Sequence, residues 1–201
     1  MIKNIVFDFG GVLLDWNPRY LYNDYFKDGR EMEYFLANIC TLERNSELDR
    51  GVPFQEWVAK YQAMFPQYSE AIALYHTGWP KMLRDSIPEG TALLEDLKSK
   101  GYSIYGLTNW SAETIGFAYG RFGFFKDFDG IVVSGEEKVT KPDPEIFRIL
   151  LDRYGLDAGE CVFLDDSPVN VAAAASLGFN AVLFDDIGRV RAELDMVLNR
   201  K

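Results

Sequence analysis

Four charged side chains occupy positions where they could act together on one ligand. Asp8 follows the apolar stretch NIVF, Asp165 and Asp166 follow the apolar stretch CVFL, and Lys141 begins the segment KPDPEIF. Two like charges 4 Å apart repel by about 4 kcal/mol at an effective dielectric constant near 20, so three ionised carboxylates need compensation. A divalent cation, together with the Lys141 ammonium, would supply it. Oxygen donors with no nearby histidine or cysteine favour Mg²⁺ over zinc.

Small and polar residues accompany these charges. Thr108 and Asn109 follow the apolar run 103–107, and Ser134 follows the run 130–133. Gly10 and Gly11 come directly after the Asp8–Phe9 pair, where they let the backbone turn sharply, so that the Gly10 carbonyl can face a bound cation. Each of these residues alone has an ordinary structural explanation, such as a helix N-cap or a surface lysine. Their placement after separate strands is what indicates a site.

Five short apolar runs must position these residues. They are Ile5–Phe9, Ser103–Leu107, Gly130–Val133, Cys161–Leu164 and Ala181–Phe184. None alternates cleanly between apolar and polar residues, which is typical of strands buried on both faces of a parallel sheet.

Segments of helical period lie between the last four runs, with clear starts and stops. They are bounded by Pro88 and Gly101, by Asp143–Pro144 and Gly155, and by Pro168 and Gly178. Strands that alternate with helices of this length predict an α/β fold, with an open, Rossmann-like parallel sheet flanked by helices. Ligands in such folds collect at the carboxyl ends of the strands.

Residues 16–86 interrupt the alternation. This segment is rich in aromatic residues and contains no convincing strand, so it predicts three or four helices that form an inserted helical cap. Trp57, Tyr61, Met64 and Phe65 have the spacing of one packed helix face. The expected domains are therefore a core of residues 1–15 and 87–201 and an all-helical cap of residues 16–86. A cap at this point could close over Asp8 and exclude water.

The composition limits the choice of partners. Hydrophobic residues make up 48% of the 201 residues, and 31 acidic against 21 basic side chains give a net charge of -10. Nucleic acid is an unsuitable partner for such an acidic chain. Cys40 and Cys161 lie far apart, which favours a reduced, cytoplasmic setting. No apolar run approaches the roughly 20 residues that a membrane span needs, and a monomer is the default expectation.

Four ordered motifs resemble those of the haloacid dehalogenase-like hydrolase superfamily. They are FDFGGVLLD at 7–15, LTN at 107–109, KPDPEIF at 141–147 and FLDDSPVNVAAAASLGF at 163–179. The resemblance implies a Rossmann-like core with a helical cap between the first and second motifs.

The resemblance also implies a role for each motif residue. Asp8 would be a nucleophile that forms an aspartyl-phosphate or aspartyl-ester intermediate. Thr108 and Asn109 would bind the transferred group, and Lys141 would stabilise its charge. Magnesium would be held by Asp8, the Gly10 carbonyl and Asp166, with Asp165 bound to the ion or just behind it.

Position 10 departs from the usual phosphatase pattern. A second aspartate normally stands there as general acid, and losing such a group forfeits about 10²–10⁴-fold in rate, roughly 3–5 kcal/mol. Either an acidic leaving group, such as the anomeric hydroxyl of a sugar 1-phosphate, needs less help, or another residue supplies the proton. Asp15 is the best candidate donor in the sequence, and the lone His76 is a poor one.

Three functions remain open at this point. The favoured one is a Mg²⁺-dependent phosphatase of a small phosphorylated metabolite, and the first motif resembles a sugar-1-phosphate phosphatase branch with glycine at the same position. A metal-free 2-haloacid dehalogenase is the runner-up, because halide leaves without a proton; dehalogenases of the superfamily, however, lack the paired acids. A non-catalytic member that binds a phosphorylated ligand or a protein is the third.

Substrate contacts are expected from the segment after the first strand and from the second motif. Asp15 ends the first core segment, Trp16, Asn17 and Arg19 begin the cap, and Trp110 directly follows Asn109. Most aromatic residues of this chain must nevertheless be core, because they are 15% of it.

Overall fold

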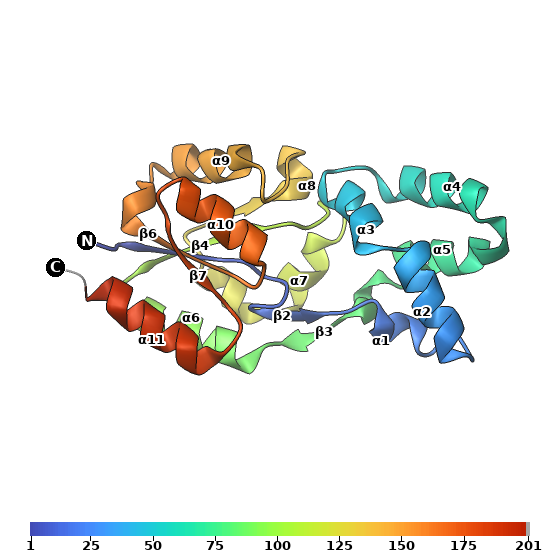
Figure 1. Ribbon diagram of the computed structural model, residues 1–201, viewed down its shortest axis with the longest axis horizontal. Coiled ribbons are helices and arrows are strands. Elements are labelled where there is room, and N and C mark those ends of the chain that lie inside the picture. Colours follow the sequence, from blue (N-terminus) through green and yellow to red (C-terminus); the bar gives the residue numbers. More distant parts are fainter. Residues whose placement is uncertain (200–201) are drawn as a thin grey trace.

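The computed structural model describes residues 1–199 and contains a five-stranded parallel sheet (Figure 1). Its strands are β1 (Asn4–Phe7), β4 (Ser103–Thr108), β5 (Gly130–Val133), β6 (Cys161–Asp165) and β7 (Asn180–Leu183). The order across the sheet is β5-β4-β1-β6-β7, and every neighbouring pair is parallel. The sequence prediction of an open parallel α/β sheet is confirmed, with strand ends shifted by one or two residues.

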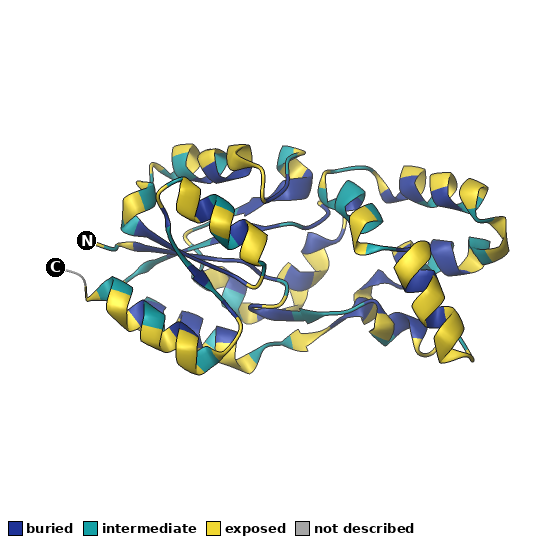
Figure 2. Cartoon of the chain, in the orientation of Figure 1, coloured by how far each residue is buried: buried dark blue, intermediate teal, exposed yellow. Residues whose placement is uncertain are grey.

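Both faces of the sheet are covered by helices, so β1 and β6 are buried throughout and the edge strands β5 and β7 are partly buried (Figure 2). Successive residues of β1 point to opposite faces of the sheet. Ile5 and Phe7 belong to the apolar cluster on one face, and Val6 belongs to the cluster on the other. The first cluster includes residues of α6 (Pro88–Ser99), α7 (Ile115–Arg121) and α11 (Ile187–Leu198); the second includes residues of α9 (Pro144–Tyr154) and α10 (Pro168–Ser176). Two short helical segments, η3 (Gly123–Asp127) and η4 (Ala158–Glu160), precede β5 and β6.

The predicted helix boundaries agree with the structure. Asp143 caps α9 by accepting a hydrogen bond from the backbone N–H of Glu145, and Gly155 ends the helix with φ +64°. Pro88 and Pro168 are the first residues of α6 and α10. Proline suits this position because its φ is already helical and its missing N–H would have no partner there.

The segment between the first two core strands is largely helical, and it lies to one side of the sheet (Figure 1). Its elements are α1 (Arg19–Tyr22), α2 (Gly29–Asn38), α3 (Leu42–Asp49), α4 (Phe54–Met64) and α5 (Ser69–Thr77), with the short turns η1 (Pro66–Tyr68) and η2 (Trp79–Met82). We refer to these elements together as the cap. It has five helices where three or four were expected.

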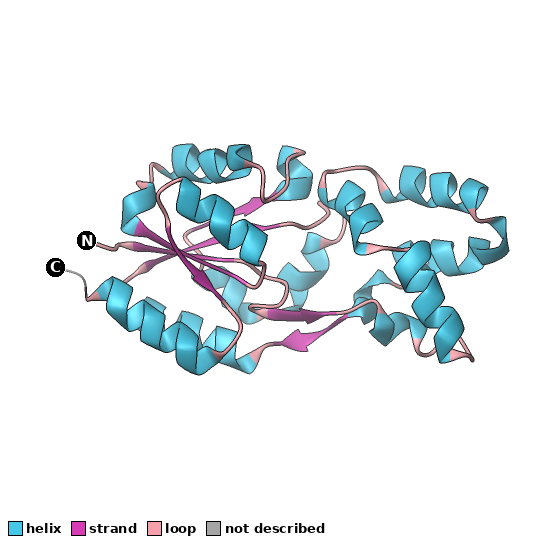
Figure 3. Cartoon of the chain, in the orientation of Figure 1, coloured by secondary structure: helices cyan, strands magenta, loops and turns pink. Residues whose placement is uncertain are grey.

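The prediction of no strand in residues 16–86 was wrong. β2 (Leu14–Trp16) pairs antiparallel with β3 (Leu83–Ser86), and this two-stranded ribbon connects the core to the cap (Figure 3). The ribbon is short and its β3 carries two exposed charged residues, so it has no apolar run that the sequence could reveal.

The aromatic stripe predicted on one cap helix is only partly correct. Trp57 and Tyr61 of α4 are buried, but Met64 is 54% exposed and Phe65 is half-buried against the Arg44 guanidinium. Helical spacing places a side chain on a face but does not say where that face stops being covered, and Met64 is the last residue of α4.

No helix among residues 1–199 has the length and the apolar character that crossing a membrane would require. Cys40 and Cys161 are both buried and unbridged.

One glycine sets how closely α6 approaches the loop after β1. A Cβ added at Gly90 would lie 1.9 Å from the Val12 carbonyl oxygen, so a side chain there must move backbone. We predict that Gly90→Ala lowers the free energy of unfolding by about 1–3 kcal/mol, as overpacking usually does. Urea denaturation measures the change. Gly29→Ala is the control, because Gly29 also lies in the first turn of a helix but has open space around its Cβ position; equal losses in the two variants would contradict the prediction.

Candidate functional site

The ammonium group of Lys141 joins two acidic residues at the edge of the sheet. Its Nζ lies 2.9 Å from Asp8 Oδ1 and 2.7 Å from Asp165 Oδ2, and it donates a third hydrogen bond of 2.8 Å to the Leu107 carbonyl. These three partners use all of its donor hydrogens. Lys141 is buried, so the contacts are shielded from water.

The strands bring these residues together as the sequence predicted. Asp8 directly follows β1, and its backbone N–H donates to the Leu164 carbonyl of the neighbouring β6. Asp165 is the last residue of β6, and Asp166 comes next. Because β1 and β6 are parallel neighbours, their carboxyl ends meet at one edge, where ligands bind in this class of fold.

Asp165 is fully occupied by the protein. Its Oδ1 accepts hydrogen bonds from the backbone N–H of Ser167 at 2.8 Å and from Asn170 Nδ2 at 3.0 Å, and its Oδ2 accepts from Lys141. The side chain is completely buried. Asp165 therefore holds Lys141 in place and has little capacity left for a ligand. Asn170 was not expected at the site, although its place in the first turn after DDSP is a signal that could have identified it.

Asp8 and Asp166 differ from Asp165 because they keep oxygens free. Each of the three acids offers one carboxylate oxygen within 4.8 Å of the others, a spacing that could hold one cation. Gly11 allows Asp166 to approach: its φ is +72°, and a Cβ there would lie 2.1 Å from Asp166 Oδ2. A glycine at position 11 is thus required by both the backbone and the carboxylate.

The pKa values of the site reflect this crowding. Burial raises the pKa of Asp8 to about 7, with the carboxylates of Asp165 and Asp166 adding to the rise and Lys141 opposing it. Burial and the Asp165 charge also raise the pKa of Asp166. Burial lowers the pKa of Lys141, but the two neighbouring carboxylates outweigh this, so that its net shift is upward and the group stays charged. A bound cation would favour the ionised acids.

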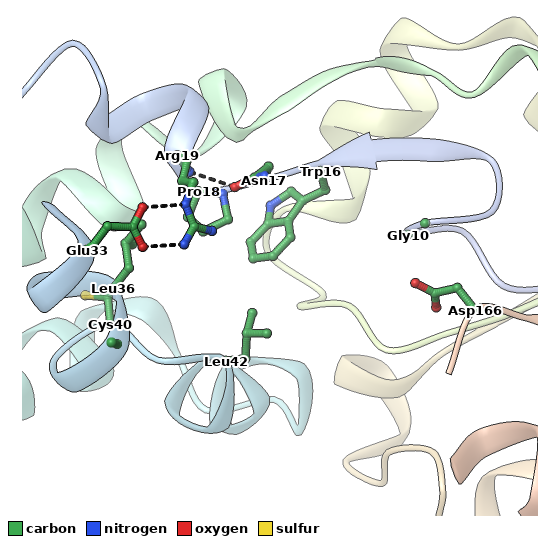
Figure 4. Close-up of a pocket in the computed structure, with 12 residues that line it drawn as sticks. Gly10, Trp16, Asn17, Pro18, Arg19, Glu33, Leu36, Cys40, Leu42 and Asp166 are labelled. Atoms are coloured by element: carbon green, nitrogen blue, oxygen red, sulfur yellow. Dashed lines mark hydrogen bonds and ion pairs between the residues drawn. The ribbon is translucent and has the colours of Figure 1, made fainter. Parts of the chain in front are cut away.

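Two cavities open in front of the acids, between core and cap. The first, of about 450 Å³, runs along α1 and α2, and the second, of about 490 Å³, runs along α3 and the ends of β4 and β6. Gly10, Trp16, Leu42 and Asp166 line both. Figure 4 shows the Asp166 carboxylate and Gly10 on the core side of the first cavity, with Trp16 and Leu42 extending across it.

Thr108 and Asn109 lie at this edge with different surroundings. Thr108 ends β4, and its buried Oγ1 has no hydrogen-bond partner within residues 1–199. Asn109 lines the second cavity, but its side chain is already engaged: Nδ2 donates to the Lys141 carbonyl at 2.9 Å, and Oδ1 accepts from the Lys141 N–H at 2.8 Å. Thr108 therefore has an unused buried hydroxyl at the sheet edge, whereas Asn109 positions the lysine.

The expected substrate-contacting residues are not all at the cavities. Trp16 lines both, and its half-buried ring carries an Nε1 with no partner in the described chain. Trp110 lines the second cavity, although its ring is buried against Trp79 and its Nε1 donates to Thr114. Asp15 lines neither cavity: it lies between two inward-facing residues of β2, and both of its oxygens accept from the Tyr20 hydroxyl.

Four further residues singled out in the sequence have structural partners. Arg19 lines the first cavity in a two-point ion pair with Glu33, at 2.8 and 2.6 Å (Figure 4). Asn17 Oδ1 accepts from the Arg19 N–H. His76 is exposed and stacks on Phe54 with ring centres 4.6 Å apart. Ser134, expected at the sheet edge, bridges core and cap: its Oγ donates to the Asp49 carbonyl and accepts from the Trp110 N–H.

With the acids, the lysine and the motif residues in one site, the sequence can be compared with known proteins. Residues 2–178 match the haloacid dehalogenase-like hydrolase family. The chain belongs to this family. It is therefore a hydrolase, and the resemblance seen in its motifs is confirmed at the level of the superfamily.

Relatives of this hydrolase include enzymes of two chemistries. The sesquiterpene phosphatase astK of Aspergillus oryzae is 29% identical over 182 residues, covering 88% of this chain and 86% of that protein. The (S)-2-haloacid dehalogenase 4A of Burkholderia cepacia is 24% identical over 194 residues, covering 90% and 82%. The fold is that of a HAD family enzyme of Bacteroides thetaiotaomicron solved with magnesium and inorganic phosphate, with TM-score 0.72, 23% identity and coverage of 92% and 97%.

The charge of Lys141 should contribute strongly to the stability of this hydrolase. We expect Lys141→Met to lower the free energy of unfolding by about 3–5 kcal/mol in EDTA, because it leaves Asp8 and Asp165 buried without a counter-charge. Urea denaturation at neutral pH measures this loss. Lys98→Met is the matched control, since Lys98 pairs with Asp129 at 2.9 Å but both side chains are solvent-exposed, and its loss should be far smaller. Similar losses in the two variants would contradict the proposed role of Lys141.

Proposed function

We propose that this hydrolase is a Mg²⁺-dependent phosphatase of a small phosphorylated metabolite, with Asp8 as the nucleophile. The supporting observation is the charge balance of the site: three carboxylates lie together with one ammonium group, which pairs with two of them, and this leaves two negative charges if all are ionised. One divalent cation would neutralise them. The available donors are oxygens, which suit magnesium.

The contacts of the Asp8 carboxylate support its proposed role as the nucleophile. Its Oδ1 accepts from Lys141 Nζ and from the Phe9 N–H at 2.7 Å, while Oδ2 accepts no hydrogen bond from residues 1–199. An Oδ of Asp8 forms a bond to phosphorus, and the bond to the leaving oxygen breaks. Lys141 would shield the charge of the phosphoryl group, and Thr108 Oγ1, which is buried and has no partner within residues 1–199, would hydrogen-bond it.

Magnesium would be held by Asp8, Asp166 and the Gly10 carbonyl. When bound, it supplies positive charge to the phosphoryl oxygens and keeps both carboxylates ionised. Asp165 remains bound to Lys141 and Asn170, so its contribution is to fix the lysine.

The residues that line the two cavities favour a small substrate whose leaving group carries no second phosphate. Among described residues that line the two cavities, Lys141 and Arg19 are the cationic ones, and Arg19 is paired with Glu33. A second phosphate on the substrate would find no free cationic partner there. Together with glycine at position 10, this supports a sugar 1-phosphate, whose anomeric oxygen leaves readily.

Metal dependence gives the central test of the proposal. At a Mg²⁺ concentration ten times its dissociation constant, binding should stabilise the wild type by about 1.4 kcal/mol, and Asp166→Asn should lose most of this gain. Denaturation with and without Mg²⁺ measures it. Asp24→Asn removes the same charge from an exposed cap position and should keep the full response. An undiminished response in Asp166→Asn would exclude Asp166 as a ligand.

Phosphatase activity is expected to need both the cation and Asp8. Release of inorganic phosphate from sugar phosphates should require Mg²⁺ and should be abolished in Asp8→Asn, because an amide oxygen is a poor nucleophile. Hexose 1-phosphates should have the higher kcat/KM relative to hexose 6-phosphates. Equal values for the two would remove the support for an anomeric leaving group.

The dehalogenase alternative is favoured by one observation, the glycine at position 10, because halide needs no proton donor. The relative from Burkholderia cepacia shows that this chemistry occurs near this chain in sequence. The free Asp166 carboxylate argues against it, since a metal-free reaction gives no reason to gather a further acid. Incubation with 2-chloropropionate in EDTA distinguishes the two, and chloride release without metal would overturn the phosphatase proposal.

A further inference from the structure

We propose that Asp49, on the cap, donates the proton to the leaving oxygen and so replaces the carboxylate that is missing at position 10. This inference rests on the proposed phosphatase function and names a further catalytic residue for it. Asp49 is the last residue of α3 and had no distinguishing signal in the sequence. It lines the second cavity together with Gly10, Lys141 and Asp166.

The end of α3 is fixed to the core, so Asp49 has a defined position. Ser134 Oγ donates a 2.6 Å hydrogen bond to the Asp49 carbonyl, and Arg50 Nε donates to Thr140 Oγ1 at 3.3 Å. Gly51 follows with φ +87°, and a Cβ there would lie 2.7 Å from the Gly135 carbonyl oxygen. Backbone of the cap therefore lies directly against backbone of the core beside the reactive edge.

A chain of hydrogen bonds orients the Asp49 side chain. The buried Tyr75 hydroxyl donates to Asn45 Oδ1 at 2.9 Å, which directs Asn45 Nδ2 toward Asp49 Oδ2, also at 2.9 Å. Within residues 1–199, Asp49 Oδ1 has no hydrogen-bond partner, and it is not sealed from solvent. One oxygen is thus anchored and the other can carry a proton into the cavity.

The remaining titratable groups that line the two cavities have other roles or partners. Lys141 and Asp166 belong to the acidic cluster itself. Glu33 is bound at two points by Arg19, and this contact lowers its pKa. Burial raises the pKa of the Cys40 thiol, which disfavours its ionised form. Asp15, the donor expected from the sequence, lies outside both cavities.

The surroundings of Asp49 also suit proton transfer near neutral pH. Burial raises its pKa to about 7, while the Asn45 amide and the positive charges of Arg50 and Lys141 oppose the rise. Tyr75 faces it from α5 through Asn45, and Asp166 lies across the cavity. A carboxylic acid with a pKa near the working pH is an efficient general acid.

The proton balance of both half-reactions is complete with this one residue. In the first, the bond from Asp8 to phosphorus forms, the bond from phosphorus to the leaving oxygen breaks, and that oxygen takes the proton of Asp49. In the second, the Asp49 carboxylate takes a proton from water as the water oxygen bonds to phosphorus and the bond to Asp8 breaks. Phosphate leaves, and both side chains return to their starting states. Water attacks from the side that the leaving group occupied, so one residue can serve both steps.

Leaving-group dependence tests the proposal directly. Purified wild type, Asp49→Asn and Glu43→Gln are compared in Mg²⁺ on n-butyl phosphate, whose alkoxide needs a proton, and on p-nitrophenyl phosphate, whose acidic phenol does not. We expect Asp49→Asn to lose about 10²-fold or more in kcat on the alkyl ester but less than about threefold in phosphoryl transfer to Asp8 from the aryl ester, followed as the p-nitrophenolate burst. In Asp49→Asn, the new amide oxygen can still accept the hydrogen bond from Asn45 Nδ2. A burst with the aryl ester shows in the same experiment that the variant is folded. Glu43 is an exposed acid of the same helix that lines neither cavity, and its variant should match the wild type on both esters.

The outcomes separate this inference from the phosphatase proposal. If Asp49→Asn loses the burst as strongly as alkyl-ester turnover, or loses neither, Asp49 is not the donor, while wild-type turnover still supports a phosphatase. If the wild type hydrolyses neither ester nor any sugar phosphate, the phosphatase proposal itself fails. The alkyl-ester kcat of the wild type should also fall as pH rises through the Asp49 pKa, because the acid must be protonated, and this limb should be absent in Asp49→Asn.

Discussion

The contact of one buried ammonium with two carboxylates organises this structure. Lys141 bonds Asp8 and Asp165, which follow or end neighbouring strands, and it also bonds the Leu107 carbonyl of β4. It therefore connects three adjacent strands at their carboxyl ends. A buried charge is costly unless it is paired. The ammonium can reach both carboxylates only if the strands keep their register and the loop that carries Lys141 keeps its path. The two hydrogen bonds between the Asn109 side chain and the Lys141 backbone hold that loop. The same contacts of Lys141 therefore build the site and stabilise this edge of the sheet.

The two glycines after Asp8 show how packing and chemistry make different demands. Gly11 is required, because its positive φ and the nearby Asp166 carboxylate leave no room for a side chain. Gly10 is not: a Cβ there would meet no atom within 4 Å. The absence of an acid at position 10 is thus not imposed by the fold. The space beside Gly10 would admit an acid, and in the proposed reaction the proton comes from the cap instead.

Much of the core could be predicted from sequence because its signals are local. Buried strands give continuous apolar runs, and residues after them must gather at one edge, so the cluster of Asp8, Lys141 and Asp165 followed from spacing alone. The ribbon of β2 and β3 could not be predicted in this way, since its residues are few and half-exposed. The roles of individual residues were even harder to predict from the sequence than the ribbon. Asn109 binds the Lys141 backbone and Asp15 points to Tyr20, because hydrogen-bond partners depend on loops whose paths the sequence pattern does not encode.

Asp49 illustrates why part of the site lies beyond any local pattern. Three features make Asp49 a candidate proton donor. A core hydroxyl binds its backbone carbonyl, an amide binds one of its carboxylate oxygens, and the residue lines the second cavity. Each partner comes from a different element, at a different distance along the chain. Because Asp49 belongs to the cap and Asp8 to the core, the proposed reaction requires the two parts to keep the arrangement that the structure shows. The contacts of Asp49 and Arg50 with Ser134 and Thr140 maintain this arrangement, so that losing them would separate the proposed proton donor from the nucleophile.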